Sequence, residues 1–127
     1  MMKQIEMIKG AKKMVDDCTK VKEGENVLII TDTVTPLSIA EVLAIACRER
    51  GAEAVIIIMN PLQVEQNDPP PPVVAAMQKA QVIFVVCSQS IVHSPSRIKA
   101  IKAGARFFPF SEVTEEYMYK GAIEANI

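Results

Sequence analysis

Apolar residues in this chain fall into two alternating patterns. Short uninterrupted apolar runs, typical of parallel strands buried on both faces, alternate with segments in which apolar residues recur every three or four positions. The second pattern is typical of amphipathic helices. Pro109 places the last strand at a sheet edge, because proline cannot donate to a strand ladder. The predicted strands are Val27–Thr31, Ala54–Met59, Val82–Cys87 and Arg106–Phe110.

The periodic segments predict a helix before the first strand, one between each pair of strands, and one after the last. The first is indicated by apolar residues at helical spacing: Ile5, Ile8, Ala11, Met14, Val15 and Cys18. Those between the strands are Leu37–Arg50, Val73–Ala80 and Ser94–Ala103, and Ser111 or Thr114 caps the last.

The residue types at the predicted helix ends support these helix boundaries. Thr35 and Ser94 are suitable N-caps, and each is followed by a proline at the first helical position, Pro36 and Pro95. The proline-rich segment Asn60–Pro72 is expected to be an irregular surface loop of polyproline II character, without helix or strand.

The order of these elements predicts one α/β domain over residues 1–127, a small Rossmann-like, three-layer domain. A parallel sheet of about four strands has helices on both faces. The helix beginning at Leu37 is apolar around much of its circumference, so we expect it to be buried on two sides. One side is the sheet, and the other is a second domain or a second copy.

Composition narrows the possible partners and the compartment. The chain has 127 residues and a net charge of −1, which gives no electrostatic reason to expect nucleic acid or a membrane surface. Neither a signal peptide nor a membrane-spanning apolar run is recognisable, so a cytoplasmic protein is expected. Cys18, Cys47 and Cys87 are far apart and lie in apolar segments, which indicates buried free thiols and no zinc site.

The turn after the first strand carries Asp32, Thr33 and Thr35. It lacks the glycines that let a backbone approach a pyrophosphate, which argues against an NAD or FAD site. A P-loop motif is absent as well. Asp32 and Thr33 are therefore either substrate contacts or residues that form the turn and cap the helix.

A second polar cluster follows the third strand and contains Ser88, Ser90, the only histidine His93, and Arg97. Open α/β sheets bind ligands beyond the carboxyl ends of their strands, so these residues are substrate-facing candidates. A serine hydrolase is disfavoured because no nucleophile elbow is present. His93 has either a structural or a substrate-facing role. Arg97 opposes the helix dipole in a first turn, which favours an anionic partner.

Three stretches of the chain resemble one family in order and spacing. They are GAKKMVDDCTKVKEGENVLIITD, DPPPPVVAAMQKAQVIFVVCSQSIVHSPSR and AGARFFPFSEVTEEY. They look like the N-terminal domain of the thermophilic aminopeptidase (aminopeptidase T-like) family, some of whose relatives are iron-dependent dioxygenases that open dihydroxypyridine rings. Gln89, Ile91 and the Phe110-Ser111 pair depart from the family pattern and leave the substrate open.

The resemblance implies a longer protein whose C-terminal domain holds divalent metal ions through carboxylates and histidines. With one histidine, this chain does not supply those ligands, so no metal or other cofactor is expected in it. The resemblance also makes His93 the first-choice functional residue.

The leading hypothesis is an aminopeptidase-like N-terminal domain that is inactive alone. Its expected partners are the C-terminal metal-binding domain and a second copy in a homodimer. The alternatives are a stand-alone ligand-binding or dimerisation module, and a domain of a dihydroxypyridine dioxygenase.

Overall fold

The computed structural model describes residues 2–62, 68–88, 94–110 and 114–118. Within these residues the strands are β1 (Asn26–Asp32), β2 (Glu53–Met59), β3 (Val82–Val86) and β4 (Arg106–Pro109). They pair in parallel as one four-stranded sheet in the order β2-β1-β3-β4. This confirms the predicted α/β class and the position of each strand.

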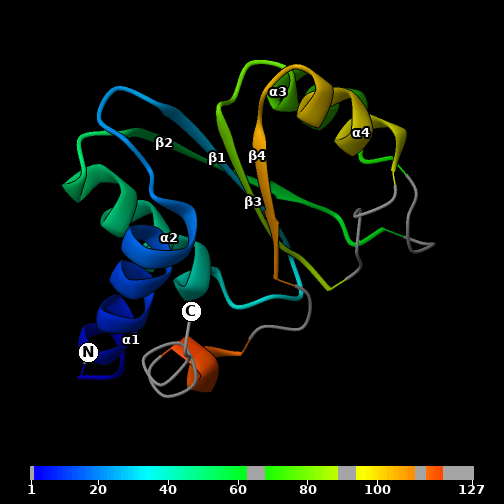
Figure 1. The fold of residues 1–127 in the computed structure, drawn as a ribbon. Helices are drawn as coiled ribbons and strands as arrows, with labels where there is room; N and C mark the ends of the chain where they lie inside the picture. The colour runs from blue at the N-terminus through cyan, green and yellow to red at the C-terminus, as the bar shows by residue number, and fades with distance from the viewer. Residues whose placement is uncertain (1, 63–67, 89–93, 111–113, 119–127) are drawn as a thin grey trace.

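Helices cover both faces of the sheet (Figure 1). α1 (Met2–Lys13), its π-helical continuation η1 (Met14–Thr19) and α2 (Leu37–Glu49) lie on one face. α3 (Pro71–Met77) and α4 (Pro95–Lys102) lie on the other. The three-layer arrangement is therefore as predicted. None of the helices in the described residues is long and apolar enough to cross a membrane.

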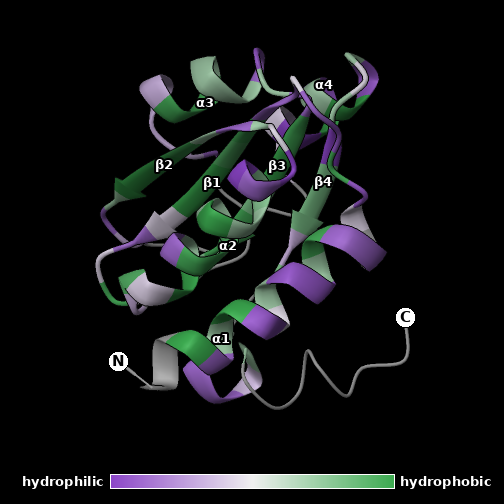
Figure 2. Cartoon of the chain, turned by 90° about the vertical axis from the view of Figure 1, so that its left-hand side faces the viewer, coloured by the Kyte–Doolittle hydropathy of each residue, from purple (hydrophilic) through white to green (hydrophobic). Residues whose placement is uncertain are grey.

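Alternation along β1 divides the core into two clusters. Val27 and Ile29 pack with α1 and α2, while Leu28 and Ile30 pack with α3 and α4. β1 and β3 are buried over nearly their whole length because each lies between two other strands. Figure 2 shows the resulting contrast between hydrophobic strands and helices with a hydrophilic outer side.

The interpretation of β2 as a buried strand was wrong. β2 is an edge strand, and all its residues before Met59 are exposed or only partly buried. An uninterrupted apolar run has the same appearance in a central strand and in an apolar edge strand, so the pattern could not separate the two cases.

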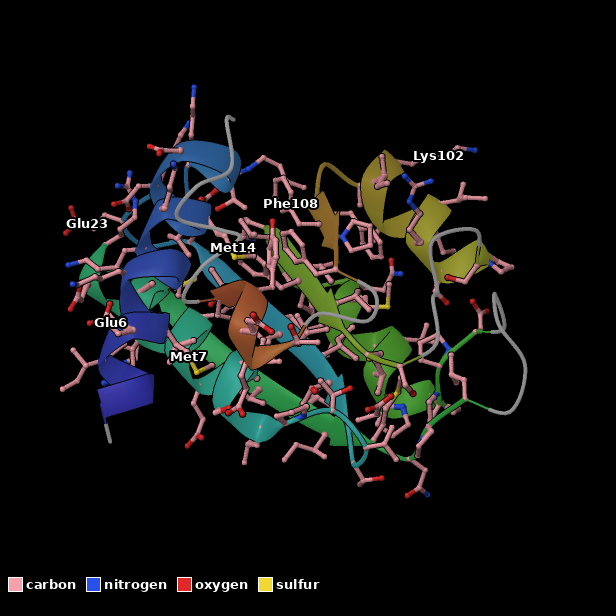
Figure 3. The ribbon with its side chains drawn as sticks, turned by 90° about the horizontal axis from the view of Figure 1, so that it is seen from below. Glu6, Met7, Met14, Glu23, Lys102 and Phe108 are labelled. Atoms are coloured by element: carbon pink, nitrogen blue, oxygen red, sulfur yellow. The ribbon has the colours of Figure 1, made fainter. Side chains whose placement is uncertain are left out.

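The first helix also differs from its prediction. Met7, Ala11 and Met14 are buried, whereas Ile5 is 49% exposed. Figure 3 shows Met7 and Met14 on the inner side of this helix.

α1 packs against α2, so the second covered side of α2 is a helix of the same chain, and neither a second domain nor a second copy is needed there.

Three expectations about helix ends and the proline loop need correction or extension. Thr35 does not cap α2, which begins two residues later at Leu37 with Pro36 at the N-cap position. Pro71 and Pro72 form the first turn of α3, where a proline loses no intrahelical hydrogen bond. Thr114 accepts a hydrogen bond from the amide of Tyr117 (3.1 Å) and so caps the last helical turn, whereas Ser111 lies outside the described residues.

Two predictions about single residues are confirmed. Ser94 is the N-cap of α4, and its hydroxyl accepts a hydrogen bond from the amide of Arg97 (3.3 Å). Cys47 and Cys87 are buried free thiols, and burial raises the pKa of each to about 12. The side chain of Cys18 is outside the described part of the chain.

Candidate functional site

The strand order creates a topological switch point between β1 and β3. The chain leaves β1 to form β2 on one side and later returns to form β3 on the other. The connections therefore diverge at the carboxyl ends of β1 and β3, which is where open α/β sheets bind ligands. Asp32 ends β1, and Ser88 follows β3 by two residues.

The Asp32 carboxylate joins these two strand ends. One oxygen, Oδ2, accepts hydrogen bonds from the amide and the hydroxyl of Ser88, at 2.7 and 2.6 Å. The other, Oδ1, accepts from the hydroxyl of Thr35 at 2.7 Å and from the amides of Thr35 and Val34 at 3.0 and 3.3 Å. The carboxylate thus holds both the β1 turn and the start of the loop after β3.

None of these five donor groups carries a charge. Burial raises the pKa of Asp32, but the hydrogen bonds from Ser88 and Thr35 outweigh this effect and hold the pKa below its ordinary value. Asp32 is therefore ionised at neutral pH. Both of its oxygens are engaged by protein donors, as in a turn-forming residue, which does not favour a general base or a metal ligand.

Hydroxyl groups beside Asp32 are better placed for contact with a ligand. The Ser88 hydroxyl uses its hydrogen on Asp32, and its oxygen accepts no hydrogen bond from the described residues, so it can accept one from a bound molecule. Thr33 is exposed, and its amide donates to the carbonyl of Met59 (3.1 Å) at the end of β2. Thr33 lines an open pocket of about 470 Å³ together with Asp32, Leu37 and Ile58.

Arg97 lies on the other side of the switch point. Its guanidinium lies over the ring of Phe107 on β4, 5.5 Å from the ring centre. Its Nε is buried, with no hydrogen-bond partner among the described residues. β4 is two strands away from β1, so the structure does not bring Arg97 to Asp32.

The segment that contains Ser90 and His93 lies outside the described residues, and their roles stay predictions. Ser88 and Ser94 stand at its two ends. Ser94 is fixed by its cap on α4, and the α4 amide of Ser96 donates to the Asp68 carboxylate (3.0 Å). Neither this Asp68 contact nor the pairing of Asp32 with Ser88 was predictable from the sequence, because both join positions far apart in the chain.

The described residues do not fit a metal centre. They contain no group of three or more His, Cys, Asp or Glu side chains that could hold an ion. Cys87, the thiol closest in sequence to the site, is buried and donates to the carbonyl of Ile30 (3.5 Å). Burial and the charge of Asp32 raise its pKa to about 12, so the thiol is protonated at neutral pH.

The fold and this strand end define a class: a doubly wound parallel α/β domain with polar side chains at its switch point. The chain belongs to the family described as NicX, 2,5-dihydroxypyridine 5,6-dioxygenase, whose family model matches residues 6–120. No curated protein matches the chain.

A solved structure supports the fold. The chain is similar to 2,5-dihydroxypyridine dioxygenase from Pseudomonas putida KT2440, with a TM-score of 0.65 and 16% sequence identity. The match covers 86% of this chain and 35% of that one, so this chain spans about a third of the dioxygenase. At this identity the likeness establishes the fold alone. Both comparisons name a dioxygenase, which favours the dioxygenase alternative of the sequence analysis over the aminopeptidase hypothesis.

Proposed function

We propose that this chain is the substrate-facing α/β domain of an iron-dependent dioxygenase that opens dihydroxypyridine rings. The family match over residues 6–120 carries this proposal. The polar side chains at the carboxyl ends of β1 and β3 support it, because they present hydroxyl groups at the end of the sheet that takes ligands. In this proposal the chain recognises the ring but does not perform the oxidation.

The iron that the family resemblance implies is held by residues outside this chain. The chain has one histidine, the described residues offer no cluster of metal ligands, and Asp32 is occupied by five hydrogen bonds. We therefore assign no step of oxygen chemistry to its side chains. An iron-bearing domain is the expected partner at this end of the sheet.

Each candidate residue then has a role in recognition. The Ser88 oxygen accepts a hydrogen bond from a ring hydroxyl, and the exposed Thr33 hydroxyl contacts the ligand from the β2 side. Arg97 attracts an ionised ring hydroxyl, because its guanidinium keeps a positive charge. Ser90 and His93 are proposed to complete the contact from the loop after β3.

An amide NMR titration of the isolated chain with 2,5-dihydroxypyridine under anaerobic conditions tests this function. We expect the amides of Thr33, Ser88 and Arg97 to shift with added ligand, and those of Glu25 and Gln81 at the opposite sheet end to stay unchanged. Leucinamide, an aminopeptidase-type ligand, is the matched control. The proposal fails if 2,5-dihydroxypyridine shifts no amides at the carboxyl end, or if leucinamide alone shifts them.

A further inference from the structure

The two edges of the sheet differ in how well they are protected. β4 is four residues long and contains Pro109, which cannot pair with a further strand. β2 is seven residues long, contains neither proline nor lysine, and has one charged residue, Glu53, at its start. A long apolar edge of this kind is a template for pairing with another strand.

The backbone of β2 has a regular set of outward-facing groups. The amide of Glu53 donates to Glu25 next to β1, and the carbonyl of Met59 accepts from Thr33. In a parallel pair, alternate residues turn both backbone groups toward the same neighbour. Ala54, Ile56 and Ile58 therefore turn their amides and carbonyls to the outer edge, where no strand of the described residues lies.

Side chains next to this edge are exposed on both faces of the sheet. Val55 is 55% exposed, and it borders an apolar pocket of about 300 Å³ beside Ala76 and Ala80 near the end of α3. On the opposite face Ile58 is 51% exposed and shares a pocket with Leu37 of α2. A strand added at this edge would cover apolar side chains above and below the sheet.

We infer that β2 pairs with β2 of a second copy of this chain, antiparallel and about a two-fold axis at Ile56. In this register Ile56 faces Ile56, and Ala54 faces Ile58 of the second copy. All three outward-facing residues then form hydrogen-bonded pairs, with about six backbone hydrogen bonds in total. The result is a continuous eight-stranded sheet.

The register is self-complementary in charge as well as in hydrogen bonding. A two-fold axis places the Glu53 of each copy at opposite ends of the strand pair, facing Met59 of the other copy. Six residues of strand separate the two carboxylates by roughly 20 Å. This exceeds the Debye length at physiological salt, so the only charges on the strand do not oppose pairing.

The size of the contact sets its strength. The seven residues of β2 with the flanking ends of α2 and α3 make an interface at the small end of the range for specific complexes. We expect a reversible dimer with a Kd on the order of 10 µM.

Sedimentation equilibrium of the full chain at about 1 µM to 1 mM, concentrations that bracket this Kd, tests the inference. We expect monomer at the low end and dimer at the high end. Ile58→Lys should weaken the dimer at least tenfold, because it places a charge beside the new strand pair. Ile98→Lys is the matched control: Ile98 is 47% exposed on α4, far from β2, and this variant should dimerise like the parent chain.

Cysteine cross-linking tests the register. Ile56→Cys brings two thiols to the two-fold axis at a Cα separation of about 5.5 Å, within the range of a disulfide. Ala54→Cys separates its two thiols by four residues along the strands and should not cross-link. Circular dichroism establishes that each variant is folded.

Three outcomes would overturn the inference. The first is a monomer at every concentration, which would leave the edge for a different partner, such as an iron-bearing domain. The second is a dimer that Ile98→Lys weakens and Ile58→Lys does not. The third is cross-linking of Ala54→Cys but not of Ile56→Cys.

Discussion

The two ends of the sheet each carry a carboxylate that joins two elements, but they compensate its charge differently. At the amino end, Glu25 receives two hydrogen bonds of 2.8 Å from the guanidinium of Arg106 on β4. At the carboxyl end, Asp32 receives its hydrogen bonds from hydroxyls and amides alone. A cation therefore neutralises the Glu25 carboxylate, whereas the dipoles of hydroxyl and amide groups stabilise the Asp32 carboxylate.

Both carboxylates are expected to contribute to stability, and under the proposed function only the carboxyl end also faces a ligand. The ion pair at the amino end ties β4 to the turn before β1. The network at the carboxyl end also adds stability, but it fixes the hydroxyl of Ser88 with an acceptor oxygen available. The following predictions test this comparison, beginning with the largest expected effect.

Asp32→Ala should have the largest effect on stability. It leaves the partly buried amide and hydroxyl donors of Ser88 and Thr35 without their acceptor, and we expect a loss of about 3 kcal/mol in the free energy of unfolding. Urea denaturation at pH 7 measures it. Asp17→Ala, at an exposed position, is the control and should change the value by less than about 0.5 kcal/mol. Equal effects of the two substitutions would show that the carboxylate does not hold the strand ends.

Glu25→Gln should have a smaller effect, about 1–2 kcal/mol. The Glu25 side chain is 16% exposed, but its partner Arg106 is 36% exposed, and solvent screens part of the interaction. The same urea experiment measures this change. A loss larger than that of Asp32→Ala would reverse the proposed ranking of the two ends.

The pH dependence of stability provides a separate test of Glu25. The hydrogen bonds from Arg106 lower the pKa of Glu25 to about 2 in the folded chain, below its ordinary value of 4.5. The unfolded chain therefore binds the proton more readily, and the contribution of Glu25 is lost as the pH falls from about 4.5 to about 2. Glu25→Gln should flatten the stability curve in this interval. An unchanged curve would contradict the assignment.

Ser94→Ala should cost about 1 kcal/mol, because it removes the N-cap of α4. Ser94→Thr keeps a hydroxyl acceptor at the cap and should retain most of the stability. If both variants lose the same amount, the hydroxyl contributes through packing and not through the cap.

Salt should produce the smallest difference. Raising NaCl to about 1 M screens the exposed part of the Glu25–Arg106 pair and should reduce the effect of Glu25→Gln by a few tenths of a kcal/mol. The effect of Asp32→Ala should stay nearly constant, since Asp32 is buried and its hydrogen-bond donors are neutral. If salt changed the effects of both substitutions equally, the two carboxylates would not differ in whether a cation or neutral dipoles stabilise their charge.

The elements were predictable from the sequence to the extent that they follow local patterns. Apolar runs located the strands, and Ser94 with Pro95 located the start of α4. The burial of β2 was not predictable, because it depends on which strands lie beside it. The prediction that Thr35 caps α2 was wrong. Its hydroxyl donates to Asp32, three residues before it, and the helix begins at Leu37.

The position of the candidate site was predictable from the sequence, but the hydrogen bonds within it were not. Polar residues directly after β1 and β3 indicated the carboxyl end of the sheet, and Asp32 has the turn-forming role that was one of its two alternatives. The hydrogen bond between Asp32 and Ser88 joins positions 56 residues apart, so no local sequence pattern predicts it. Ser90 and His93 remain predictions.

The central claim is that this chain recognises the ring and does not hold the iron. Its most direct test adds Fe(II) anaerobically to the isolated chain, measures bound metal by equilibrium dialysis, and then follows oxygen uptake with 2,5-dihydroxypyridine. We predict no stoichiometric iron and no oxygen uptake above that of Fe(II) with substrate but no protein. One bound iron per chain, with oxygen consumed in proportion to the 2,5-dihydroxypyridine lost, would contradict the account.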